Sequence, residues 1–514
     1  MSLLNWVLFA PAAAFFAGLW LPRENARAIR MYALAVSLLA FALSLGLLAD
    51  VGRSASGFWH VTDRVWMETP KIRYHVGVDG VSVWLVLLTT FLTPLAVLVS
   101  WNYIQQRVKE FHLFLLLLEF GLIGVFVSLD LFLLYVFWEI SLVPMYFLIG
   151  VWGHERRIYA AVKFFLYTMA GSVLMLAAIL YLYTRADTFD YLQIYHLLAS
   201  GHLTLTAAEE FWLFLGFFIA FAIKVPLFPL HTWLPDAHVE APTAGSVMLA
   251  SVMLKMGTYG LLRFCLPLFP SAARECAPWI VFLAITGILY GALVSMVQPN
   301  LKKLVAYSSV SHLGFVVLGL FSFTQQGLDG AVYQMLNHGV STGALFILVG
   351  YLYERRHSLE IADYGGVATA APWLSAAFMV TMLASIGLPT LNNFVGEFLV
   401  LQGAAIENFT WAAWAAVGVI LSACYMLWAY QRTFFGETPE IVRSHVFDLR
   451  AREFAAIVPL ILLMVWMGMA SQTFLPTIGH TNARILQRVD GEKEIRVSSP
   501  QPLVAVAREV LNAR

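Results

Sequence analysis

The stretch FAIKVPLFPLH, residues 221–231, places Lys224 inside an apolar run and follows it with Pro226 and Pro229. A charged side chain is costly in the hydrocarbon core of a membrane, and a proline removes a backbone hydrogen bond from a helix. The combination indicates a membrane-spanning helix that is broken beside its lysine. The whole chain of 514 residues is 60% hydrophobic and 12% charged, whereas soluble domains have about 25% charged residues. Composition therefore predicts one membrane-embedded body rather than several soluble domains.

The apolar segments set the fold class. A helix needs about 20 apolar residues to cross the hydrocarbon core. Fourteen candidate spans satisfy this requirement, at residues 3–21, 29–49, 81–101, 111–129, 131–151, 161–183, 210–228, 245–268, 278–297, 303–322, 330–353, 373–403, 411–433 and 453–475. The seventh and the twelfth are interrupted by proline or glycine. We expect an all-α polytopic membrane protein of about 14 transmembrane helices, in which helices 7 and 12 are broken.

Basic residues in the loops predict the orientation. Most of them fall in alternate loops, for example those with Arg23, Arg107, Arg156, Lys302 and Arg355. Loops rich in lysine and arginine stay on the cytoplasmic side. Both termini are therefore expected outside.

Several classes of function are disfavoured. The net charge is zero, so no nucleic-acid partner is implied. The three cysteines are scattered, which argues against a disulfide framework or a cysteine-bound cluster. No phosphate-binding loop or dinucleotide fingerprint is present. His231 and His238 flank a proline in a pattern that gives little support to a metal site, so no metal or cofactor is expected in this chain.

An internal repeat relates the two halves. Residues 161–185 and 331–355 match at seven of 25 positions without a gap, and each copy is followed by one of the interrupted spans. The copies lie five spans apart, an odd number, so they would be inverted in the membrane. Inverted repeats with broken helices are typical of transporters, whose ion sites lie at the breaks.

Ionisable groups inside the spans each need an explanation, since one at the helix centre costs about 2.5–3.5 kcal/mol on insertion scales. Glu119 has no partner that the sequence can name. The candidates for a proton path are Glu139, Lys224, Lys255, His312, His338 and Glu397.

Glu139 and Lys224 suit proton movement as a pair. Burial favours the neutral form of each, and close contact favours the charged form, so a change in their separation would act as a switch. The prolines would expose carbonyls to water: Pro226 frees that of Ala222 and Pro144 that of Ile140. A static ion pair is the alternative, and each histidine taken alone could be a core residue.

Four motifs resemble a known family. WEISLVPMY, FAIKVPLFPLHTWLPDAHVEAPTAGSVMLASVMLKMGTYGLLRF, LKKLVAYSSVSHLGF and NFVGEFLVL are similar to the antiporter-like subunit M family of bacterial NADH-quinone oxidoreductase, whose mitochondrial counterpart is chain 4 of complex I. The likeness extends over residues 1–475. A glutamate on the second broken helix, here Glu397, is typical of subunit M.

The resemblance implies a layout for the chain. It implies N-terminal helices 1–3 in residues 1–110 and a first five-helix repeat, helices 4–8, in residues 111–268. A second, inverted repeat, helices 9–13, would occupy residues 278–434, and residues 450–514 would form helix 14 and a polar tail.

The resemblance also implies roles. Glu139, Lys224 and Lys255 match the family's charged residues on helices 5, 7 and 8. Glu397 matches the acid on helix 12, and His312 and His338 match histidines of the central hydrophilic axis. The chain would move protons across a bacterial inner membrane or, as the less favoured setting, a mitochondrial one. FMN, iron–sulfur clusters and quinone would reside in partner subunits, and two related antiporter-like subunits would flank this one in the lipid bilayer.

Three other functions remain open from the sequence. A multisubunit Na⁺/H⁺ antiporter and a membrane-bound hydrogenase use related subunits, and a flavin and iron–sulfur spectrum or a nickel signal in the purified complex would discriminate between them. A membrane scaffold that pumps nothing is the third. Loss of pumping in an assembled Lys224 or Glu139 variant would exclude it.

Overall fold

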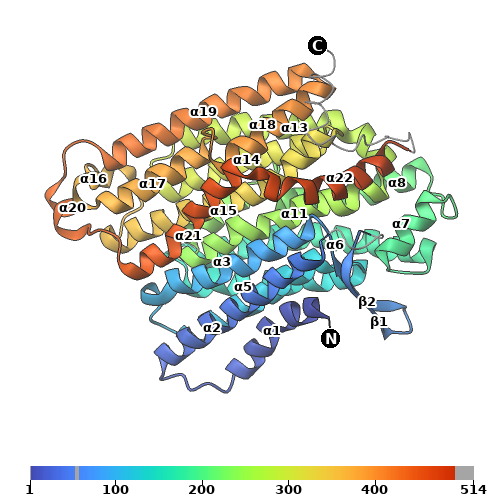
Figure 1. The fold of residues 1–514 in the computed structure, drawn as a ribbon, viewed down its shortest axis with the longest axis horizontal. Helices are drawn as coiled ribbons and strands as arrows, with labels where there is room; N and C mark the ends of the chain where they lie inside the picture. Colours follow the sequence, from blue (N-terminus) through green and yellow to red (C-terminus); the bar gives the residue numbers. More distant parts are fainter. Residues whose placement is uncertain (1, 52–56, 492–514) are drawn as a thin grey trace, which may run out of the picture.

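Helices dominate the chain, because a backbone without access to water has to pair its own polar groups. The computed structural model describes residues 2–51 and 57–491. Long helices lie side by side, with α1 and α2 at one edge of the bundle and α19 at the opposite edge (Figure 1). The expected all-α polytopic membrane fold is confirmed.

The elements before the first break follow the predicted spans. They are α1 (Leu3–Gly18), α2 (Ala26–Leu45), η1 (Gly46–Asp50), β1 (Trp59–Met67), β2 (Ile72–Val78), α3 (Ser82–Tyr103), α4 (Val108–Val127), α5 (Leu131–Trp152), α6 (Arg157–Ala186), α7 (Tyr191–Ala199) and α8 (Ala207–Lys224).

The elements after the first break begin with a short helix. They are α9 (Trp233–Glu240), α10 (Thr243–Met248), η2 (Leu249–Met253), α11 (Leu254–Gly260), η3 (Leu261–Cys265), α12 (Leu266–Leu268), α13 (Pro270–Met296), α14 (Leu301–Leu320), α15 (Gln325–Arg356), η4 (Ile361–Asp363), α16 (Val367–Ala370), α17 (Pro372–Ser385), α18 (Asn392–Glu407), α19 (Phe409–Phe434), α20 (Glu440–His445), α21 (Ala451–Met469), η5 (Ser471–Thr473) and α22 (Leu475–Val489).

Eleven helices in the described part of the chain are long and apolar enough to cross a membrane. Two shorter apolar helices, α1 and α17, also match predicted spans. The seventh predicted span corresponds to α8, which carries Glu209, Glu210 and Lys224. Both predicted breaks are observed, between α8 and α9 and between α17 and α18. The number of helices that cross the membrane, the inverted repeat and the domain boundaries stay predictions.

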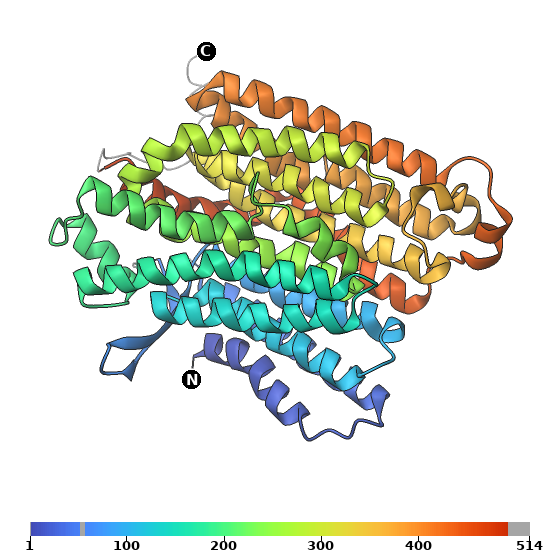
Figure 2. The same ribbon diagram turned by 180° about the vertical axis from the view of Figure 1, so that it is seen from behind.

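Two helical segments form the centre of the bundle. The segment Thr243–Leu268, which runs from α10 to α12, and α15 are enclosed along their whole apolar lengths. The outer helices α2, α13, α19 and α21 instead expose much of their surface. Seen from behind, the bundle keeps the same order from α1 to α19 (Figure 2). Charged groups on the two central segments are therefore shielded on every side.

A β-hairpin stands at one end of the bundle, and the sequence analysis did not anticipate it. Strands β1 and β2 pair in antiparallel fashion, and β2 continues into a bridge between Val76 and Ser128, next to α5. Residues 59–78 alternate aromatic or β-branched with polar side chains, a pattern typical of strands. The start of α1 and the end of α22 lie at the same end as the hairpin (Figure 1).

The predicted polar tail needs a correction. Residues 475–489 form α22, which contacts α12, α13 and α15. Its buried residues Ile478, Asn482, Ile485 and Val489 recur at helical spacing, so one face of this polar segment packs on the bundle. The rest of the predicted tail, residues 492–514, lies outside the described residues.

Candidate functional site

The first break begins directly after Lys224. The carbonyl of Phe221 accepts from the N–H of Val225 at 2.8 Å, and that of Ala222 accepts from the N–H of Leu227, also at 2.8 Å. The indole N–H of Trp233, on α9, donates to the carbonyl of Ile223 at 2.9 Å. The prediction that Pro226 leaves the Ala222 carbonyl free is therefore wrong. The chain turns back on itself after the proline and pairs the helix-end carbonyls.

The ammonium group of Lys224 lies among aromatic rings. Its Nζ is 5.4 Å from the ring centre of Trp138 and 5.2 Å from that of Phe164. The side chain is fully buried, and Nζ has no hydrogen-bond partner among the described residues. Attraction to aromatic faces is the contact that remains for the charge.

Glu139 lies on α5, next in the chain to Trp138. No ion pair joins its carboxylate to Lys224 among the described residues, so the static ion pair considered from the sequence is not observed. Oxygen Oε1 of Glu139 is also buried without a partner. The structure thus holds the two groups apart, and the switch between close and distant arrangements stays a prediction.

Lys255 occupies the middle of the fully buried segment. Two single turns of π-helix, η2 and η3, flank its helix α11. The Lys255 Nζ donates to the carbonyl of Ala250 at 2.6 Å and lies 2.6 Å from Nδ1 of His338. Wider π turns are found at functional sites, where they expose a carbonyl to a side chain. Here the Ala250 carbonyl, five residues earlier, is turned towards the lysine.

A chain of side chains continues from Lys255 across α15 and α14 to α18. The rings of His338 and His312 lie 6.1 Å apart between centres. Nδ1 of His312 is 2.8 Å from Oε1 of Glu397. No residue in this group is more than 3% exposed. The structure therefore brings together four of the six predicted residues: Lys255, His338, His312 and Glu397.

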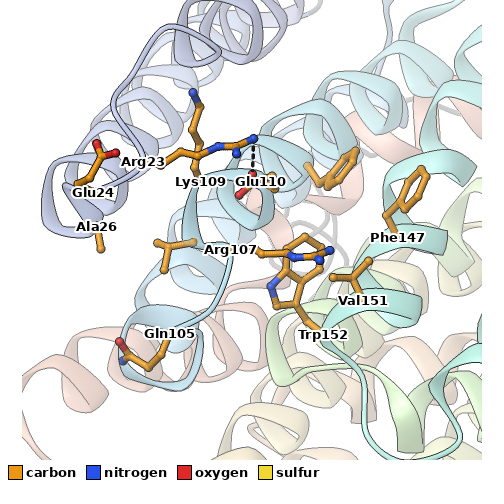
Figure 3. Close-up of a pocket in the computed structure, with 12 residues that line it drawn as sticks. Arg23, Glu24, Ala26, Gln105, Arg107, Lys109, Glu110, Phe147, Val151 and Trp152 are labelled. Carbon is orange, nitrogen blue, oxygen red and sulfur yellow. Dashed lines mark ion pairs between the residues drawn. The ribbon is translucent and has the colours of Figure 1, made fainter.

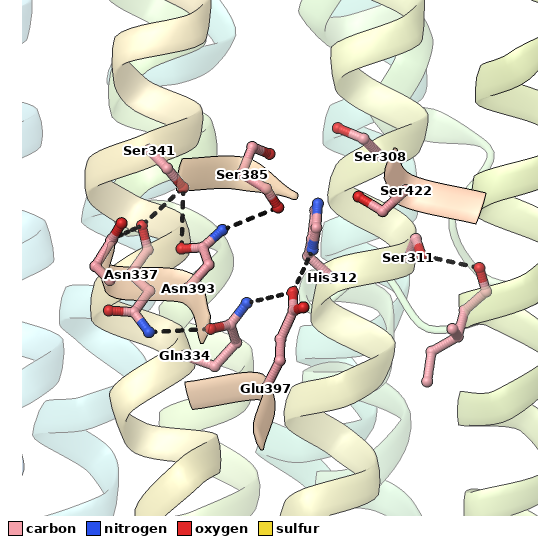
Figure 4. A network of polar contacts seen from close by, with 12 residues as sticks. Ser308, Ser311, His312, Gln334, Asn337, Ser341, Ser385, Asn393, Glu397 and Ser422 are labelled. Atoms are coloured by element: carbon pink, nitrogen blue, oxygen red, sulfur yellow. Dashed lines mark hydrogen bonds and ion pairs between the residues drawn. The ribbon is translucent and has the colours of Figure 1, made fainter. Parts of the chain in front are cut away.

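Neutral amides surround the carboxylate of Glu397 (Figure 4). Gln334 Nε2 donates to Oε1 of Glu397 at 3.0 Å, and Asn337 Nδ2 donates to Oε1 of Gln334 at 3.1 Å. Gly396 permits this approach, since a Cβ there would lie 2.5 Å from Oε1 of Gln334. These amides were not predicted, although polar residues within apolar spans, as in QMLNHGVS (334–341), are a signal that could have identified them.

Two more buried basic groups were missed as site residues. His238, on α9, is fully buried and stacks on Phe346 at 4.4 Å, and neither of its ring nitrogens has a partner in the described structure. Lys302 was assigned to a loop, and this assignment is wrong. Its side chain is 1% exposed at the start of α14, where Nζ donates to the carbonyl of Ala241 at 2.8 Å.

Some expected links are not seen. No hydrogen bond or ion pair joins Lys224 to Lys255 among the described residues, so the first break is separate from the chain of four. Glu119 is fully buried on α4, and neither of its oxygens has a hydrogen-bond partner in the described part of the chain. His231 stacks against Phe228 rather than approaching His238. In residues 2–51 and 57–491, no three His, Cys, Asp or Glu side chains gather as a metal site would require.

The arrangement is suited to passing protons. Lysine, imidazole and carboxylate each bind and release a proton, and hydrogen bonds between them give a proton a route. Nε2 of His312 and Nε2 of His338 are buried without a protein partner. Buried polar atoms of this kind are satisfied by ordered water, so a water bridge or a ring rotation would complete the step between the two rings.

Comparisons with known proteins agree with this geometry. A family model described as "NADH:quinone oxidoreductase/Mrp antiporter, TM" matches residues 128–423. A second, "NADH-ubiquinone oxidoreductase chain 4, amino terminus", matches residues 53–125. Subunit M of the NADH-quinone oxidoreductase of Rhodobacter capsulatus is 45% identical over 95% of this chain and 96% of its own length.

Solved structures show the same fold. A chain of respiratory complex I from Thermus thermophilus, solved with bound NADH, superposes with a TM-score of 0.86 at 34% identity, covering 95% of this chain and 99% of that one. A chain of the Mrp complex from Dietzia reaches a TM-score of 0.81 at 21% identity over 95% of this chain and 100% of that one, which indicates a shared fold. Together these matches place the chain in the subunit M and chain 4 family of the NADH-quinone oxidoreductases.

Proposed function

We propose that this chain moves protons across a bacterial inner membrane as a subunit of NADH-quinone oxidoreductase. The observation that carries the proposal is the buried chain Lys255–His338–His312–Glu397, with contacts of 2.6 Å at one end and 2.8 Å at the other. A purely structural core does not need four neighbouring ionisable groups at membrane depth, because burying each of them costs free energy.

Each residue has a proposed role. Glu139 and Lys224 form the entry site at the first break, and Lys255 receives the proton from them. The ammonium of Lys255 donates to Nδ1 of His338, which therefore carries its proton on Nε2 when neutral. A proton accepted at Nδ1 and released from Nε2 moves on to His312.

The far end of the chain is built to hold and release a proton. Nδ1 of His312 donates to Glu397 when the carboxylate is ionised, and Gln334 donates to the same oxygen. Transfer from His312 to Glu397 leaves a neutral acid and a neutral imidazole, so no buried charge is created by the step. Release from Glu397 to the outside then restores the carboxylate.

The energy for this movement would come from other subunits. Members of the family act in complexes with redox chemistry, and we place FMN, the iron–sulfur clusters and the quinone in partner subunits. Two related antiporter-like subunits would flank this chain. Within it, the two bundles around the α8–α9 and α17–α18 breaks would be inverted copies.

The test uses the assembled complex in proteoliposomes. Lys255→Met keeps an unbranched side chain of similar length but cannot hold a proton. We expect assembly and NADH-dependent electron transfer to persist while the protons moved per electron fall. Lys303→Met is the matched control, because this lysine lies at the inner end of α14, away from the chain of four.

Two results would overturn the proposal. An assembled Lys255→Met complex with an unchanged ratio of protons to electrons would leave the chain of four without a role in transport. A purified complex without flavin and iron–sulfur absorbance, but with sodium–proton exchange, would assign the chain to an antiporter instead.

A further inference from the structure

A pocket of about 790 Å³ (Figure 3) opens beside the turn between α1 and α2, which lies at the end of the bundle opposite the hairpin (Figure 1). It lies between the α1–α2 turn, the α3–α4 turn and the C-terminal end of α5. This is the end that the basic loop residues assign to the inside. None of the six residues of the predicted proton path lines this pocket.

The rim of the pocket is basic. Arg23, Arg107 and Lys109 line it together with Glu24 and Glu110, which leaves one positive charge in excess. Arg23 pairs with Glu110 at 3.0 Å, and Nζ of Lys109 donates to the carbonyls of Leu19 and Leu21 at 2.6 and 2.7 Å. These bonds hold the α1–α2 turn against α4 and fix one wall of the pocket.

The remaining cation is the guanidinium of Arg107. This exposed side chain makes no hydrogen bond or ion pair with residues 2–51 or 57–491, and Arg107 sits at the N-cap of α4, where no side chain caps the helix. The N–H groups of the first turn of α4 thus lack side-chain acceptors. An uncapped helix start beside a free guanidinium favours a negatively charged group.

The floor of the pocket is aromatic and open to the side. The rings of Phe114 and Phe147 stack with centres 5.2 Å apart, and Trp152 meets Phe114 edge-on at 6.3 Å. The indole N–H of Trp152 donates to the carbonyl of Gln106 at 2.9 Å, which anchors the ring at the rim. Phe147 is 38% exposed, on the surface that would face lipid.

These features point to an amphiphile with an anionic head and an apolar body. Figure 3 shows Arg23 and Glu110 on one side of the pocket and Phe147, Val151 and Trp152 on the other. A small soluble anion would leave the aromatic wall uncovered, whereas an acyl chain beneath the headgroup would bury it.

We propose that the pocket binds an anionic phospholipid of the inner leaflet. Its phosphate lies beside Arg107 and the start of α4, and an acyl chain runs along Phe147 and Phe114. The excess of one positive charge matches the single negative charge of such a headgroup. Bound there, the lipid joins the turns before α2 and α4 to the end of α5, the helix that carries Glu139.

The experiment places the whole complex in nanodiscs that contain photoactivatable phosphatidylglycerol, or phosphatidylcholine with the same reactive acyl chain. After illumination, lipid adducts are mapped by mass spectrometry. We expect phosphatidylglycerol adducts on the C-terminal end of α5 and the α1–α2 turn. Arg107→Gln should lower their yield about fivefold, because one basic residue near a membrane surface contributes about 1 kcal/mol to the binding of an anionic lipid. Arg443→Gln, which removes an exposed arginine from the same end, should leave the yield unchanged.

Four results would overturn the proposal. Equal yields for the two headgroups would mean that the site does not select charge. An unchanged yield in Arg107→Gln would remove the guanidinium from the site. Loss of the adducts on adding inorganic phosphate would assign the pocket to a free anion, and absence of adducts in the complex would mean that another subunit covers it.

Discussion

Two substitutions of Lys224 test its positive charge and its ability to exchange a proton separately. Lys224→Met keeps an unbranched side chain of similar length among the aromatic rings and removes the charge. Lys224→Arg keeps a positive charge that remains protonated in proteins. The proposed function requires a group that gains and loses a proton, so both variants should stop proton transfer through this subunit.

The two variants should differ in stability. A lysine at the centre of a span costs about 2.5–3.5 kcal/mol, and the cation–π contacts with Trp138 and Phe164 return about 0.5–2 kcal/mol. Because Nζ has no hydrogen-bond partner in the described structure, the difference between these two ranges predicts that Lys224→Met stabilises the subunit by about 0.5–3 kcal/mol. Lys224→Arg adds bulk to an enclosed site and should destabilise it by about 1–3 kcal/mol.

Two measurements on the assembled complex test this reasoning. Proton uptake per NADH oxidised in proteoliposomes reports function, and retention of the subunit after heating in detergent reports stability. We expect low uptake in both variants, with higher retention in Lys224→Met and lower retention in Lys224→Arg. Normal uptake by Lys224→Arg would show that a fixed positive charge suffices. Reduced retention of Lys224→Met would show that the lysine stabilises the fold.

Three further predictions concern the second break and the outer loops. Glu397→Gln keeps the shape of the group that accepts from His312 but cannot ionise. Proton uptake should therefore fall, while a high-resolution map should show His312 in the same position. Gly396→Ala should displace the Gln334 amide, since a Cβ would lie 2.5 Å from its oxygen, and should cost about 1–3 kcal/mol in subunit stability, measured by heat retention. Asp130 lies in the outer loop before α5, and burial raises its pKa from 3.8 to about 6. Its contribution to the free energy of unfolding is therefore largest below pH 3.8 and is lost as the pH rises through about 6. Hydrogen exchange of residues 128–133, corrected for intrinsic rates, should show this dependence, and Asp130→Asn should remove it.

The breaks and the ionisable residues were predictable because their signals are local. A lysine followed by two prolines, or a glutamate soon after GLPTLNN, departs from the apolar background of a span and is visible in one sequence. The contact between Lys255 and His338 could not be predicted from a local signal. The two residues are 83 positions apart, and periodicity does not show which helices face each other. Only the family resemblance, and not the pattern of apolar residues, predicted that these two residues belong to one hydrophilic axis.

Other features had weak or misleading signals. Lys302 lies two residues after Asn300 and precedes a second lysine, so it is easily taken for a loop residue. Its burial depends on tertiary contacts, including the bond of its Nζ to the carbonyl of Ala241 after α9. The hairpin at residues 59–78 and the helix α22 mix polar with apolar residues and contain no continuous apolar run, so a search for apolar spans passes over them. The partner of the Ala222 carbonyl could not be foreseen either, because the path of the chain after a break depends on tertiary contacts.

The two buried lysines have different surroundings, and the difference bears on mechanism. The ammonium of Lys224 has aromatic faces but no acceptor in the described structure, whereas that of Lys255 has a carbonyl at 2.6 Å and an imidazole nitrogen at 2.6 Å. Hydrogen bonds to acceptors stabilise a buried ammonium far more than ring faces do. Two acceptors therefore fix the ammonium of Lys255 in place, whereas only ring faces contact that of Lys224. Loading the first site then requires a further acceptor to approach Lys224, and Glu139, one residue from the Trp138 that now contacts the lysine, is the group placed to do so.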